Sequence, residues 1–254
     1  MGSQSKIFHS FHRALDSYEE HAIVQKNSAA NLITHLKNNG CMASLERVFE
    51  FGCGTGFLTR HLNQQFKINE FIANDLVQDC QIYLPKSDIQ FIAGDVSDIA
   101  IPEECDVICS ASCAQWCHDL VGLLNKLTKS LVDNGLLAIS SFTSGHFKEL
   151  IELQTTEHTN NPPLNYWTEQ TWQEQLEPNY EILTISSEES VLWFDSVREL
   201  LLHLRLTGVN GLAGKTWNQQ SLTNFENNYR ENFEIDGNVP LSYKPIYIIA
   251  RKHT

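Results

Sequence analysis

The sequence predicts an α/β fold in which helices cover both faces of a parallel sheet. Three observations lead to this fold class. Short apolar segments alternate with amphipathic helical segments between residues 22 and 141, which is typical of a parallel sheet with crossover helices. A glycine-rich turn directly follows the first apolar segment and opens a helical one. Aspartates follow the next two apolar segments, at a spacing typical of sheets that bind ligands.

The predicted elements of this sheet follow one another along the chain. Apolar residues at spacings of three and four predict a first helix, which Gly40 would end; they are Ala22, Ala29, Leu32, Ile33 and Leu36. The elements expected after it are a strand at 47–51, a helix at 57–66, strands at 70–74, 89–93 and 106–110, a helix at 120–131 and a strand at 136–141.

The pattern changes after about residue 142. Two helices are expected around a break at Pro162 and Pro163. An apolar helix is then expected to begin after Asp195 or Ser196 and to stop at Gly208. We interpret residues 195–240 as a helical insertion between the last two strands, able to cap a site. The predicted segments are helices at 147–156, 168–177 and 196–206, one long strand at 180–194, an irregular stretch at 229–240 and a last strand at 246–251.

Length and composition limit the classes of protein that fit. The 254 residues suffice for one large domain, at about 150 residues per domain. Eighteen basic against 31 acidic residues give a net charge of −13, which disfavours nucleic-acid binding. The sequence contains no run of 18 apolar residues, so no membrane span is expected. The polar segment 1–21 lacks a signal-peptide pattern, so the seven cysteines are expected to be reduced in a cytoplasmic protein.

The glycine turn is the strongest local signal of a binding site. It runs Gly52-Cys-Gly-Thr-Gly56 between a predicted strand and a predicted helix. Free amides at such a helix start can face polar or anionic ligand groups. Asp75 lies 19 residues after Gly56, where a carboxylate can accept both hydrogens of a ribose diol. The G-x-G-x-G spacing differs from the dinucleotide fingerprint, and no Lys-Ser or Lys-Thr follows it as in a P-loop. A structural turn without a ligand is the alternative.

These motifs also carry a resemblance to a known family. The segment from Glu50 to Gly56, with Asp75 and Gly94-Asp95, resembles the motif set of class I S-adenosylmethionine-dependent methyltransferases over residues 45–141. The resemblance implies a Rossmann-like, seven-stranded, mostly parallel sheet whose last strand is antiparallel, and S-adenosyl-L-methionine as cofactor. The glycine turn would hold the methionine moiety, Asp75 the ribose and Asp95 with Val96 the adenine. The cofactor-binding residues it implies are Glu50, Gly52, Cys53, Gly54, Thr55, Gly56, Asp75, Leu76, Asp95, Val96, Ser110 and Gln25.

A finer resemblance extends over nearly the whole chain. Residues 11–25, 115–120 and 200–208 are similar to segments of the malonyl-[acyl-carrier protein] O-methyltransferases of biotin synthesis. This family implies a single domain with an N-terminal helical lid at 1–40, a cofactor-binding core at 45–141 and a helical cap at about 195–240. One departure is that Ser110-Ala111 stands where the family commonly reads Ser-Asn.

The finer resemblance implies methyl transfer onto the free carboxylate of a malonyl thioester. That carboxylate is already anionic at pH 7, so neither a general base nor a metal is required. Arg205 is the first candidate for a cation that holds the carboxylate, against the alternative of a surface arginine at a helix end. Tyr18, on the lid, is expected to contact substrate or cofactor, against simple packing. Trp116 is expected at the substrate, against a place in the core.

Other readings stay open at this stage. A methyltransferase of the same fold with another small-molecule acceptor fits the cofactor motifs equally well. A non-catalytic partner protein that retains the fold is disfavoured by the intact glycine turn. Cysteines at 105, 109, 113 and 117 do not predict a metal site, because Cys109 falls inside a predicted strand. The expected partner is a malonyl-acyl-carrier protein, bound transiently, or malonyl-CoA. Basic candidates for the carrier surface are Lys126, Lys129, Lys148, Arg198 and Lys215.

Overall fold

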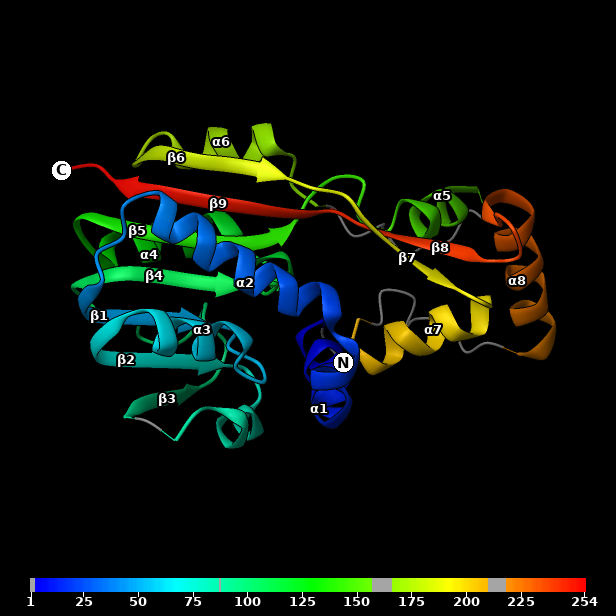
Figure 1. Cartoon of the computed structure of the whole chain (residues 1–254), viewed down its shortest axis with the longest axis horizontal. Coiled ribbons are helices and arrows are strands. Elements are labelled where there is room, and N and C mark those ends of the chain that lie inside the picture. Colours follow the sequence, from blue (N-terminus) through cyan, green and yellow to red (C-terminus); the bar gives the residue numbers. More distant parts are fainter. Residues whose placement is uncertain (1–2, 87, 157–165, 210–217) are drawn as a thin grey trace.

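A seven-stranded sheet forms the centre of the molecule (Figure 1). The computed structural model describes residues 3–86, 88–156, 166–209 and 218–254. In spatial order the strands are β3, β2, β1, β4, β5, β9 and β6. Their bounds are β1 Ser44–Phe51, β2 Lys67–Asp75, β3 Ile89–Ala93, β4 Cys105–Ala111, β5 Leu131–Phe142, β6 Tyr180–Ser187 and β9 Pro245–Lys252.

The strand directions confirm the predicted fold class. β1 pairs in parallel with β2 and β4, β2 with β3, and β4 with β5. β9, the last strand of the chain, runs antiparallel to both β5 and β6. The sheet is therefore mostly parallel with an antiparallel last strand.

Helices cover both faces of the sheet because its central strands are apolar on both sides. In β1 the four residues from Val48 to Phe51 are buried. One hydrophobic core joins α2 and α3 to the sheet, and a second joins α4 and α6 to it. The bounds of these helices are α2 Ile23–Asn38, α3 Phe57–Gln65, α4 Leu120–Ser130 and α6 Glu169–Leu176, with short 3₁₀ turns at Gln78–Tyr83 and Ala114–Trp116.

A smaller unit extends beyond the end of the sheet, on the right in Figure 1. There β7 and β8 pair antiparallel as a separate two-stranded sheet. Helices α5, α7 and α8 pack on it around a third hydrophobic core. The bounds are α5 Lys148–Thr156, β7 Ser190–Phe194, α7 Val197–Leu206, α8 Gln219–Phe233 and β8 Val239–Tyr243.

Two predictions in this part of the chain are wrong. The single strand expected at 180–194 is two strands, β6 and β7, which belong to different sheets. Apolar and polar residues alternate in the same way in β6 and β7, so this periodicity does not reveal the break between the two strands. The stretch 229–240, expected to be irregular, contains the end of α8 and the start of β8. Pro240 lies inside β8, which has a single neighbouring strand, where proline is tolerated.

The N-terminal helix α1, Ser3–His21, lies beside the sheet end from which the smaller unit extends, near α7 (Figure 1). The Ser17 hydroxyl donates to the backbone oxygen of Leu206, at 2.9 Å, and so joins α1 to α7. α1 and α2 meet at Ala22, whose backbone is not helical. In the part of the chain that the structure describes, no helix is both long and apolar enough to cross a membrane.

Candidate active site

The glycine turn between β1 and α3 has a backbone that depends on its glycines. Gly52 and Gly54 have φ angles of +66° and +53°, where a side chain is strained. A Cβ on Gly52 would lie 2.3 Å from the Cys113 sulfur. A Cβ on Gly54 would meet nothing within 4 Å. The turn therefore needs glycine at position 52 for packing, whereas position 54 borders open space.

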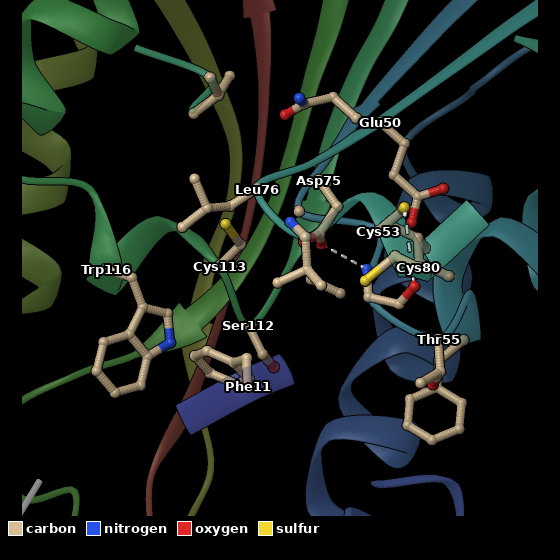
Figure 2. Close-up of a pocket in the computed structure, with 18 of the residues that line it drawn as sticks. Phe11, Glu50, Cys53, Thr55, Asp75, Leu76, Cys80, Ser112, Cys113 and Trp116 are labelled. Carbon is tan, nitrogen blue, oxygen red and sulfur yellow. Dashed lines mark hydrogen bonds between the residues drawn. The ribbon is translucent and has the colours of Figure 1, made fainter. Parts of the chain in front are cut away.

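Asp75, at the end of β2, braces this turn. Its Oδ2 accepts a hydrogen bond from the Gly54 amide at 2.8 Å, and its Oδ1 accepts one from the Val77 amide at 2.9 Å. Burial raises the pKa of Asp75, whereas the hydrogen bonds from these two amides act in the opposite direction. Figure 2 shows the carboxylate beside the turn. One side chain thus links the ends of the first two strands.

A cavity of about 1120 Å³, counted to its open mouth, lies at this end of the sheet. Ten of the predicted cofactor residues line it. The lining residues that prediction missed come from α1, from the start of α3, from the segments at the ends of β2 and β3, and from the end of β4. Among the missed ones, Phe11, Ser112 and Cys113 face the turn from the opposite side (Figure 2). The ten predicted residues are Gln25, Glu50, Gly52, Cys53, Gly54, Thr55, Asp75, Leu76, Asp95 and Val96.

The two remaining predicted residues do not line the cavity. Gly56 is the last residue of the turn and the N-cap of α3. Ser110 is fully buried inside β4. The next two residues, Ala111 and Ser112, line the cavity instead. β4 ends at Ala111, one residue beyond its predicted end. The residues of this segment that line the cavity therefore come after Ser110.

Glu50 is a buried carboxyl group in the cavity wall. Its Oε2 accepts a hydrogen bond from the Thr59 hydroxyl at 2.7 Å. Burial raises the pKa of Glu50 to about 8, and the Thr59 hydrogen bond opposes that shift. The group is therefore mostly protonated at neutral pH, and a positive charge brought next to it would favour its ionised form.

Two buried hydroxyl groups in the cavity wall have no hydrogen-bond partner among the described residues. They are Thr55 Oγ1, in the glycine turn, and Ser112 Oγ, after β4. Buried polar atoms are rarely left unpaired, because each costs about 1–3 kcal/mol. Their position indicates polar groups of a ligand as their partners.

A second, smaller cavity adjoins the first, and its empty space, counted to the open mouth, is about 290 Å³. The two share Tyr18, Gln25 and Trp116, which the sequence predicted at the site, together with Phe11 and Ser112. Tyr18 stacks on Phe57 with ring centroids 5.7 Å apart, and Trp116 meets the ring of Phe11 edge-on at 5.5 Å. The second cavity is completed by Gln115, Phe142, His146, Tyr166 and Val209.

The structure places Arg205 outside both cavities. α7 buries Val197, Leu200 and Leu204 against the core, and this leaves the Arg205 side chain exposed. Position 205 is thus turned away from the face that packs inward. Lys215 lies outside the described residues. No lysine or arginine lines the second cavity among the residues that the structure describes.

His146 is the histidine among the described residues that line the second cavity, and the sequence analysis missed it. It lies four residues beyond the end of β5. The position of its segment at the carboxyl end of a parallel strand is a signal that could have found it.

The cysteines do not form a cluster able to hold a metal. All seven are free thiols, and Cys113 and Cys117 line the first cavity. No group of three or more His, Cys, Asp or Glu side chains converges anywhere in the described ranges.

Comparison with known proteins adds three findings. Residues 49–139 match the family model described as "Methyltransferase domain". The chain is 38% identical to the malonyl-[acyl-carrier protein] O-methyltransferase of Acinetobacter baylyi, over 98% of this chain and 97% of that protein. It is 34% identical to the protein of the same name from Haemophilus influenzae, over 98% and 94%.

A solved structure shares the fold. The N-methyltransferase NodS from Bradyrhizobium japonicum, in complex with S-adenosyl-L-homocysteine, matches with a TM-score of 0.59. The match covers 97% of this chain and 98% of that one, at 12% identity. At this identity, the likeness supports the architecture alone.

Proposed function

The chain belongs to the malonyl-[acyl-carrier protein] O-methyltransferase family, and from this premise we propose that it methylates the free carboxylate of a malonyl thioester. S-adenosyl-L-methionine is the methyl donor. The product is the methyl ester, in which the negative charge of the malonyl group is masked. The sequence resemblance assigns this step to biotin synthesis. The full-length similarity to relatives of that name supports the proposal.

The first cavity fits this cofactor. Its wall contains the unpaired hydroxyls of Thr55 and Ser112 and a glycine, Gly54, that leaves the backbone open to the cavity. Glu50 and Asp75 add two carboxyl groups suited to an ammonium group and to ribose hydroxyls. When bound, S-adenosylmethionine supplies a methyl group already activated by a positively charged sulfur. The protein's own task is therefore to bind and orient.

The second cavity is the site that we assign to the malonyl group. It is small, it adjoins the cofactor cavity, and Tyr18 and Trp116 stand at the junction. Burial, followed by the nearby Asp75 carboxylate, raises the pKa of Tyr18, so its hydroxyl keeps its proton. Tyr18 thus positions the acceptor as a hydrogen-bond donor rather than as a base. Orientation of this kind supplies about 7–11 kcal/mol at best.

The lid predicted at 1–40, of which the structure describes residues 3–40, covers this junction. α1 carries Phe8, Phe11 and Leu15 into the first cavity. Excluding water from a carboxylate nucleophile strengthens the interactions that orient it. The helix α1 contacts α7 in turn, so the lid rests on the smaller unit, which caps the site.

The carrier of the malonyl group is an acyl-carrier protein or coenzyme A, bound in a weak, transient interface. Two of the candidate basic residues already have acidic partners: Lys148 pairs with Glu189, and Arg198 pairs with Glu226. Lys126 and Lys129, on α4, are exposed. The free cysteines support a reducing compartment, the cytoplasm, as the place of the reaction.

The observation that carries this proposal is the junction of a cofactor-type cavity with a small cavity lined by neutral donors. The test measures release of S-adenosylhomocysteine with malonyl-acyl-carrier protein and, as control, butyryl-acyl-carrier protein, which has no free carboxylate. Turnover is expected with the malonyl thioester alone. Equal turnover of both thioesters, or turnover of neither, would contradict the proposal.

A further inference from the structure

The second cavity raises the question of what holds an anionic carboxylate there. The described residues around it supply hydrogen-bond donors that carry no charge, from Tyr18, Gln25, Ser112, Trp116 and Tyr166. A carboxylate in such a cavity loses its water and needs donors in return. His146 is the one basic side chain among the described residues that line it.

The imidazole of His146 is held tightly in one orientation. Phe142 stacks on it at a centroid distance of 3.9 Å, and Phe147 stacks at 3.8 Å. Tyr166 and Tyr243 meet it edge-on at 4.8 and 5.1 Å. The phenyl rings cover its faces, so His146 meets the cavity through a ring edge.

One of the two ring nitrogens of His146 already has a hydrogen-bond partner. The backbone amide of Lys244 donates to His146 Nδ1 at 3.3 Å, so Nδ1 acts as the acceptor. In a neutral imidazole the proton then lies on Nε2. In the free protein, burial lowers the pKa of His146 well below its usual value, which keeps the ring neutral at physiological pH. The backbone of Phe147, with φ of +53°, is strained, as is common at binding sites.

We propose that His146 binds the acceptor carboxylate through its Nε2–H, as a neutral hydrogen-bond donor. The inference rests on the proposed function, since it assigns a residue to the substrate of that reaction. A neutral donor orients the carboxylate and replaces part of its hydration without neutralising the charge that attacks the methyl group. A methyl ester accepts a weaker hydrogen bond than a carboxylate, so the same contact favours substrate over product.

Two amide variants separate the nitrogens of the ring. In His146→Asn the side-chain oxygen can still accept from the Lys244 amide, but nothing replaces Nε2–H. In His146→Gln the amide nitrogen lies near the position of Nε2. His146→Asn is expected to lower kcat/KM for malonyl-acyl-carrier protein by about 10- to 150-fold, the loss of one hydrogen bond to a charged group. His146→Gln is expected to recover most of that loss.

His203 offers a matched control. It is also a buried histidine, its Nε2 lies 2.7 Å from the Tyr243 hydroxyl, and burial lowers its pKa to about 4. It lines neither cavity. His203→Asn is expected to lower the melting temperature while leaving kcat/KM near the wild-type value. Calorimetric affinity for S-adenosylhomocysteine is expected to stay unchanged in the His146 variants.

The outcomes decide between the two proposals. Equal kcat/KM in His146→Asn and wild type would overturn the inference. So would an equal loss in His146→Asn and His146→Gln, since that pattern reports packing alone. If His146→Asn does not fold, the comparison of His146→Gln with wild type decides, and a loss above tenfold overturns the inference. Wild-type enzyme that binds S-adenosylhomocysteine but does not methylate the malonyl thioester would instead overturn the proposed function.

Discussion

Alanine at Gly54 is expected to damage cofactor binding much more than folding. A left-handed backbone costs a residue that has a Cβ about 1–2 kcal/mol, and Gly54 has φ of +53°. Its new Cβ meets no protein atom within 4 Å, so no further steric cost arises in the free protein. In the complex the methyl group would press on the ligand, at about 1–3 kcal/mol, or roughly 5- to 150-fold in affinity.

Gly40 and Gly52 provide the matched comparisons. Gly40 also has a positive φ, +79°, with nothing within 4 Å of its Cβ, and it lines neither cavity. Gly40→Ala is expected to show the strain cost alone. At Gly52 the new Cβ lies 2.3 Å from Cys113 Sγ and 2.4 Å from its Cβ, so Cys113 must move. Strain and overpacking together predict a loss of about 2–5 kcal/mol in the free energy of unfolding for Gly52→Ala.

The assays are denaturant unfolding for stability and calorimetry with S-adenosylhomocysteine for affinity. Gly54→Ala should match Gly40→Ala in stability and fall well below it in affinity. The account of the turn is refuted if Gly54→Ala binds as tightly as Gly40→Ala. It is refuted equally if Gly52→Ala is no less stable than Gly40→Ala.

Three further predictions concern the carboxyl groups and metals. Asp75→Ala removes the acceptor of the Gly54 and Val77 amides and a contact expected to the ribose, so calorimetry should show about 10- to 150-fold weaker S-adenosylhomocysteine binding; unchanged affinity in a folded variant would exclude this strand end as a ligand contact. Burial raises the pKa of Glu50 from 4.5 to about 8, so the folded state keeps a proton that the unfolded state loses, and this group lowers the stability by about 1.4 kcal/mol per pH unit over that window. Glu50→Gln should therefore gain stability relative to wild type between pH 5 and pH 8 in urea unfolding; a constant difference would show that Glu50 does not titrate there. Turnover should survive dialysis against a chelator, because an anionic acceptor needs no Lewis acid; loss of turnover that zinc or magnesium restores would overturn a mechanism based on positioning.

The sequence was sufficient for the parallel strands of the sheet because their signals are local. The strand predicted at 89–93 has the bounds of β3. Three glycines in five residues predict the turn after β1. Each signal depends on backbone requirements within a few residues. α8 escaped prediction because it is polar, and only Phe225 and Tyr229 are buried along its length.

Most residues predicted to bind the cofactor line the first cavity, and Tyr18 and Trp116 line both cavities, whereas Arg205 lines neither. Most of the residues predicted to bind the cofactor lie in the turn and at strand ends, where sequence position fixes spatial position. Arg205 and His146 show what the sequence alone does not predict about this site. Which face of α7 turns inward depends on its partners in the smaller unit, and its spacing alone did not exclude Arg205. His146 becomes a candidate once Phe142, Phe147 and Tyr166 are seen to enclose it beside Tyr18 and Trp116.

The most direct test of the central claim is mass spectrometry of malonyl-acyl-carrier protein after incubation with the enzyme and S-adenosylmethionine. The account predicts that the carrier gains the mass of one methylene group, and that fragmentation places the gain on the terminal carboxyl of the malonyl group. A control without enzyme should show no gain. A carrier of unchanged mass, or a methyl group found elsewhere on the carrier, would contradict the assignment of this chain as a malonyl carboxyl methyltransferase.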